Sequence, residues 1–174
     1  MSIDESIKQA QAALKRHDAD AAVHALEDAL AAARKAADLE VRVVAPINHD
    51  HTGIGLYTPA KGDVVDGRRV RLYVELANYA LADIGGGAGH AQLDVTGDFS
   101  FDDPADKGAR TKLSQGVALG TQSFDTRTNL GVTSFGAEIN LGDKSPAGVY
   151  HVVVHVKDAI GSKAAQREAR FVLT

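Results

Sequence analysis

The residues with the clearest chemical potential form the tripeptide His49-Asp50-His51. In an extended segment, alternate side chains share a face and lie about 6.6 Å apart, so the two imidazoles could reach one metal ion. His151 and His155 also share a strand face, but about 13 Å separates them, which is too far for one ion. Either could join the first pair if the two strands are neighbours. The candidate metal ligands are therefore His49, Asp50, His51, His151 and His155.

This ligand set contains only imidazole and carboxylate groups, which suit zinc, copper(II) or nickel. The alternative is that these histidines are ordinary surface residues in a loop and on a solvated sheet face. No established metal-spacing motif is present to decide between the two.

Two other clusters could bind ions. Asp98, Asp102, Asp103 and Asp106 surround a proline-containing turn and could offer oxygen ligands to calcium, but their order is not that of an EF-hand loop. The glycine-rich run 85–89 would need a following helix to bind phosphate. The residues after it continue as a strand, so we expect a solvated acidic turn and a hairpin loop.

The pattern does not favour an enzyme. The chain has no cysteine, and Ser114, Ser123 and Ser134 lack the sequence context of a nucleophile elbow. A hydrolase that uses scattered Asp and Glu residues is the weakest hypothesis. With four Tyr, five Phe and no Trp, the chain also has few aromatic side chains for sugar binding. We predict no catalytic residue and no cofactor beyond the possible zinc or copper.

Charge and hydropathy exclude some partners. The 174 residues include 19 Lys and Arg against 23 Asp and Glu, which gives a formal net charge of -4. A basic nucleic-acid footprint is therefore not expected. No apolar run reaches the length of a membrane span, and the first residues do not resemble a secretory signal. The expected location is cytoplasmic, or periplasmic or secreted if a signal was removed.

The first 38 residues have the composition of helices. They contain 13 of the 29 alanines and no glycine, proline or aromatic residue. Apolar residues recur at helical spacing in two segments, which predicts an antiparallel helical hairpin over 1–38. Asp20 is the expected N-cap of the second helix.

From residue 39 the apolar period changes to two, which predicts a β domain over 39–174. In the segment 69–77, for example, Val70, Leu72 and Val74 point inward while Arg71 and Tyr73 point outward. About seven to eight strands are expected in an antiparallel sandwich. The predicted strands are 40–45, 54–58, 69–77, 91–101, 113–119, 135–141, 149–158 and 165–173.

Several framework residues suggest a known type of domain. They are Gly55-Leu56-Tyr57, Val70-x-Leu72-Tyr73-Val74-Glu75-x-x-Asn78, Gly148-x-Tyr150, Asp158-x-x-Gly161-x-Lys163-Ala164 and Phe171. Over roughly 53–173, the chain resembles the C-terminal β-sandwich domain of a group of exported bacterial proteins with no assigned activity. The resemblance implies an immunoglobulin-like sandwich and a location in the cell envelope.

Some of these framework residues also predict details of the local structure. The ring of Tyr150 should be buried, with its hydroxyl bonded to the backbone. Gly161 should supply a positive φ angle in the turn before Lys163. Glu75 should pair with Arg69, with Arg71 or with a residue of a neighbouring strand.

Framework motifs without a catalytic set favour a non-enzymatic binding or structural module of the bacterial cell envelope. Its partner would be a protein or another envelope component, with a sheet edge or the region 102–131 as the contact and the helical hairpin as docking surface or spacer. The alternative function is metal binding through His49 and His51.

Overall fold

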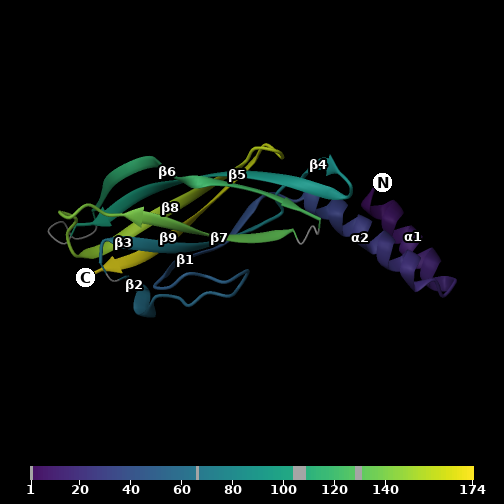
Figure 1. Cartoon of the computed structure of the whole chain (residues 1–174), viewed down its shortest axis with the longest axis horizontal. Coiled ribbons are helices and arrows are strands. Elements are labelled where there is room, and N and C mark those ends of the chain that lie inside the picture. The colour runs from purple at the N-terminus through teal and green to yellow at the C-terminus, as the bar shows by residue number, and fades with distance from the viewer. Residues whose placement is uncertain (1, 66, 104–108, 128–130) are drawn as a thin grey trace. The chain divides into compact units, whose positions relative to one another are not determined.

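The structure is a computed structural model that describes residues 2–65, 67–103, 109–127 and 131–174. It contains two compact units, Met1–Asp38 and Leu39–Thr174, which are described separately here. Figure 1 shows helices in the first unit and strands in the second.

The first unit is a pair of capped helices, α1 (Ile3–Lys15) and α2 (Ala19–Ala36). At the start of α1, Ser2 Oγ accepts from the Glu5 amide at 3.2 Å and Glu5 Oε2 accepts from the Ser2 amide at 2.9 Å, a reciprocal capping box. Helix α2 is capped by Asp18, whose Oδ1 accepts from the Ala21 amide at 3.1 Å. The prediction of Asp20 as N-cap was wrong, because α2 begins one residue before it.

The two helices pack through small side chains. The residues buried in this seam are Ser6, Ala10 and Ala13 of α1 with Ala22, Ala25 and Ala29 of α2. Most of the large apolar side chains at helical spacing are exposed instead: Ile7, Leu14, Val23, Leu26 and Leu30.

The second unit is built from two sheets. The small sheet has the order β1-β3-β7, and the large sheet has the order β2-β9-β8-β5-β4, with β6 also paired to β5. The strands are β1 (Glu40–Ile47), β2 (Val64–Val65), β3 (Arg69–Ala77), β4 (Ala82–Gly85), β5 (Ala88–Asp102), β6 (Arg110–Thr126), β7 (Val132–Asn140), β8 (Gly148–Asp158) and β9 (Lys163–Leu173), and a 3-10 turn, η1 (Lys61–Asp63), precedes β2.

The chain is therefore mainly β with two N-terminal helices, as predicted. Strand β3 has the predicted bounds exactly, and the predicted segment 113–119 is the middle of the longer strand β6. The segment 54–58 is not a strand, since it makes only an isolated bridge between Gly53 and Leu56. The short pairing of β2 with β9 is parallel, so the large sheet is mixed rather than wholly antiparallel.

The hydrophobic core lies between the two sheets. Val70, Leu72 and Val74 of β3 and Val152 and Val154 of β8 have no solvent exposure and belong to the same cluster. Side chains alternate along a strand, so each sheet also has an outer face that points away from this core.

The turn between β8 and β9 depends on a buried carboxylate. Asp158 is fully buried and accepts from the amides of Ala80, Ile160 and Gly161 at 2.7–2.9 Å. The positive φ of this turn belongs to Ser162 (54°), not to Gly161. A Cβ on Gly161 would lie 2.7 Å from Asp158 Oδ2, so the glycine is needed for close approach and the predicted reason was wrong.

Candidate functional site

The predicted ligands His49, Asp50 and His51 follow β1 on the outer side of the small sheet. Asp50 Oδ1 lies 3.2 Å from Arg71 Nη1, and the His51 ring meets the Tyr73 ring edge-on at a centroid distance of 5.4 Å. His49 and His51 line two different surface pockets. Asp50 and His51 thus contact side chains of β3, and the Asp50 carboxylate is paired with the guanidinium of Arg71.

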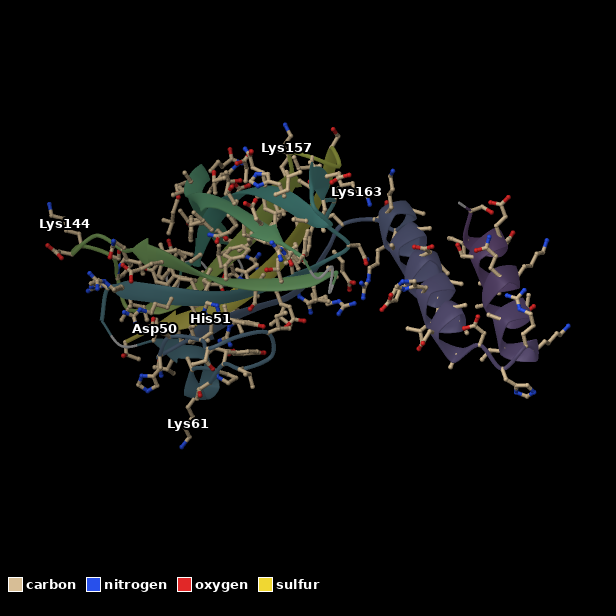
Figure 2. The ribbon with its side chains drawn as sticks, turned by 45° about the vertical axis from the view of Figure 1, so that its right-hand side comes forward. Asp50, His51, Lys61, Lys144, Lys157 and Lys163 are labelled. Atoms are coloured by element: carbon tan, nitrogen blue, oxygen red, sulfur yellow. The ribbon has the colours of Figure 1, made fainter. Side chains whose placement is uncertain are left out.

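The other two predicted ligands lie on the opposite side of the unit. His151 and His155 alternate with the core residues Val152 and Val154 on β8, so they point outward from the large sheet. Figure 2 shows Asp50 and His51 on one side of the unit and Lys157, which shares the face of His155, on the other. The predicted five-residue set is therefore not assembled, because the core separates its two halves.

Within the described ranges, no group of three or more His, Cys, Asp or Glu side chains is arranged to hold a metal ion. The proposed calcium cluster is also divided. Asp98 and Asp102 contact different histidines, and Asp106 lies outside the described residues. Metal binding by His49 and His51 stays a prediction.

Instead, the outer face of the large sheet pairs its histidines with carboxylates. His155 Nε2 donates to Asp98 Oδ2 at 3.1 Å, and His90 Nδ1 donates to Asp125 Oδ1 at 2.6 Å. We call this surface the histidine–carboxylate face. It consists of His90, His151 and His155 with Asp98, Asp102, Asp125 and Glu168.

His151 is the most enclosed member of the histidine–carboxylate face, with 8% of its surface exposed. Its Nδ1 lies 2.8 Å from Glu168 Oε1 and its Nε2 lies 3.1 Å from Asp102 Oδ2, so a carboxylate stands within hydrogen-bond distance of each ring nitrogen. Arg110 Nη1 completes the cluster by donating to Glu168 at 2.8 Å.

Two carboxylates of this face have lowered pKa values. The pKa of Asp98 is lowered chiefly because it accepts from the Gly116 amide, with a smaller contribution from His155. The pKa of Asp102 is lowered chiefly by its hydrogen bond from His151, with Arg110 and Arg170 adding favourable charge. Both carboxylates are therefore held in the ionised form.

A shallow pocket of about 420 Å³ lies on the outer face of the large sheet, beside His155. Its lining residues come from β5, β8 and β9 and include Asp94, Thr96, Lys157 and Gln166. These lining residues do not form the arrangement of nucleophile, base and orienting group that a hydrolytic site requires.

Strand β6 is the most exposed long strand of the unit. It pairs with β5 along one edge, and no described strand pairs with its other edge. Leu113 is 50% exposed and Val117 is 37% exposed. Bulges interrupt its register after Val95 and Gly97 of β5. The predicted contact region 102–131 therefore contains an exposed edge strand, although residues 104–108 and 128–130 lie outside the described ranges.

The sequence did not reveal the role of Tyr73. Although it points outward as predicted, it has no exposed surface, because the segment after β1 folds over it. Tyr57 stacks on its ring at 4.0 Å, the Gly55 amide donates to its hydroxyl at 2.7 Å, and that hydroxyl donates to Glu75 at 2.7 Å. Glu75 thus has a tyrosine partner here rather than the expected arginine.

Among the described residues, no helix combines the length and the apolar composition that crossing a membrane requires.

Comparison with known proteins gives no family for this chain. No family model matches it, and no curated protein matches it. One solved structure with some similarity is a family 123 glycoside hydrolase from Clostridium perfringens, at 8% identity and a TM-score of 0.41 over 79% of this chain and 27% of that one. Another is a DUF4466 family protein from Parabacteroides merdae, at 10% identity and a TM-score of 0.32 over 79% of this chain and 44% of that one. The chain thus spans less than half of either protein, and similarity this low carries no conclusion about activity.

Proposed function

We propose that this protein is a non-enzymatic binding module that recognises another protein through the free edge of β6. The partner would add an extended segment to this edge, so that main-chain hydrogen bonds provide affinity and side-chain contacts provide selectivity. The observation that carries the proposal is a 17-residue strand that contains no fully buried residue and whose second edge is not paired with any strand in the described ranges.

The chemistry of β6 defines the partner segment. Edge strands are usually protected by charges or bulges, and the bulges of β6 limit the stretch that can pair regularly. Leu113 and Val117 are exposed apolar contacts, and Lys112 at the start of the strand favours acidic side chains on the partner, since the neighbouring Arg110 is already paired with Glu168. The expected ligand is an extended segment that combines apolar and acidic residues.

We also propose that the β unit is an immunoglobulin-like sandwich. Two largely antiparallel sheets around one core support this proposal, as does the Tyr150 hydroxyl, which donates to the Pro146 carbonyl four residues upstream at 2.7 Å. A tyrosine near the start of a strand that bonds back to the upstream backbone is typical of such sandwiches. The bacterial cell envelope is the proposed location, supported by the resemblance of the framework residues.

Capture from periplasmic and cytosolic extracts, followed by calorimetry with the purified partner, tests the function. The test variant is the double substitution Leu113→Lys and Val117→Lys. The matched control is Ile84→Lys, which places a charge on an exposed apolar residue of β4. We expect the wild type and the control to bind the same partner and the β6 variant to lose at least tenfold in affinity. Equal binding by the β6 variant would refute recognition at this edge.

A further inference from the structure

The two helices of the first unit carry two sets of apolar positions. One set is the small-residue seam between α1 and α2. The other set consists of large side chains, each placed one position after a seam residue. These are Ile7 and Leu14 of α1 and Val23, Leu26 and Leu30 of α2, with 39–57% of their surfaces exposed.

Helix geometry places all five on one face of the hairpin. One position along a helix is a rotation of about 100°, and in an antiparallel pair this rotation turns both helices toward the same side. The positions before the seam confirm the rule, because they line one shared pocket. That pocket includes Gln9, Ala12, Ala21, His24 and Asp28. The hairpin thus has one polar face and one apolar face, and we call the latter, with the five residues above, the apolar hairpin face.

A hairpin of this size needs more burial than its seam provides. The unit has fewer than 40 residues, a length at which stability usually requires a metal, a disulfide or oligomerisation. The chain has no cysteine, and the seam buries only alanine and serine side chains. Most of the apolar surface available for stabilisation lies on the apolar hairpin face.

We propose that a second copy of the chain covers this face. Two hairpins would pack apolar face to apolar face around a two-fold axis parallel to the helices and form a four-helix bundle. The spacing supports this arrangement, because apolar residues recur at alternating three- and four-residue intervals, the pattern of helices in bundles. These positions are Ile3, Ile7, Ala10 and Leu14 in α1 and Val23, Leu26, Leu30 and Ala33 in α2, followed by its C-cap residue Ala37.

Charge at the rim supports a copy of the same chain as the occupant. The short turn between the helices places the last turn of α1 level with the first turn of α2. In the two-fold bundle, α1 packs beside α2 of the other copy, so Lys15 lies level with the partner's Asp20. This contact is attractive and occurs twice by symmetry.

Sedimentation equilibrium of the full chain tests the proposal. We expect a species of twice the 18.3 kDa chain mass. Leu26→Lys should weaken the dimer at least 100-fold, while Ala12→Lys, on the polar face, should leave it unchanged. A wild-type monomer up to millimolar concentration would overturn the proposal, as would a dimer that persists in Leu26→Lys. Far-UV circular dichroism should show unchanged helix content in Ala12→Lys and a loss of helix that accompanies dissociation in Leu26→Lys, because the seam alone provides little burial.

A charge exchange tests the arrangement without removing an apolar side chain. Lys15→Asp and Asp20→Lys alone should each weaken the dimer by about fivefold, and the double variant should recover the wild-type dissociation constant. Failure of the double variant to recover would exclude the two-fold arrangement. Neither substitution touches β6, so loss of the dimer and loss of partner binding at β6 can be distinguished.

Discussion

The outer faces of the two sheets are stabilised in different ways. On the small sheet, a returning segment covers the face, so that Tyr73 is completely buried and its hydroxyl bonds two partners. On the large sheet, polar residues remain at the surface and satisfy one another across β5, β6, β8 and β9. Stability should therefore depend strongly on the first face and weakly on the second.

The largest expected effect follows from truncating the buried tyrosine. Tyr73→Ala removes the ring on which Tyr57 stacks and should lower the free energy of unfolding by about 3–5 kcal/mol. Its counterpart on the large sheet, His155→Ala, should change that free energy by only about 0.5 kcal/mol. Urea unfolding followed by circular dichroism measures both. Similar losses for the two variants would show that the faces do not differ in this way.

Removing only the hydroxyl should have an intermediate effect. Tyr73→Phe keeps the ring but leaves the Gly55 amide and the Glu75 carboxylate without their shared partner. We expect a loss of about 1–2 kcal/mol in the free energy of unfolding. If the segment over Tyr73 is held by packing alone, this variant will unfold at the same urea concentration as the wild type.

Acid should reduce the contribution of the histidine–carboxylate face to the stability of the folded protein. Because the pKa values of Asp98 and Asp102 are lowered in the folded protein, their contribution is complete above the unfolded pKa of about 4 and is lost as the pH falls below it. Asp102→Asn should therefore reduce the loss of stability between about pH 5 and pH 2. Urea unfolding across this range gives the comparison, with Asp143→Asn in an exposed turn as control. An unchanged pH profile in Asp102→Asn would contradict the assignment.

The smallest expected effect concerns the predicted metal ligands. Tight metal binding raises the melting temperature by mass action. In the described part of the chain, no group of three His, Cys, Asp or Glu side chains is placed to hold a metal ion, and we expect 1 mM zinc or copper to raise the melting temperature by less than about 2 °C. A larger rise that disappears in the variant His51→Ala would establish the metal site instead.

The sequence predicted what depends on local periodicity. Alternation in β3 and β5 gave their inner residues correctly, because a half-buried strand requires it. Alanine content indicated the two helices. It did not show that the small side chains would occupy the seam between the helices. The alanine positions and the large apolar positions both recur at helical spacing, and the close approach of the two helices favours the smaller side chains at their contact.

What the sequence could not supply depends on contacts between distant segments. His151 lies 49 residues from Asp102 and 17 from Glu168, and only the strand order brings the three together. The burial of Tyr73 likewise depends on a segment without strand periodicity. The pattern of β3 contains no sign of this cover, and an outward tyrosine is therefore predicted as exposed.

The enclosure of Tyr73 also has a spectroscopic consequence. The chain has four tyrosines and no tryptophan, so its intrinsic fluorescence arises from tyrosine alone. Burial raises the pKa of Tyr73 and of Tyr150, which delays their conversion to phenolate in alkali. Ultraviolet difference absorbance can therefore follow the exposure of these two buried tyrosines without an added label.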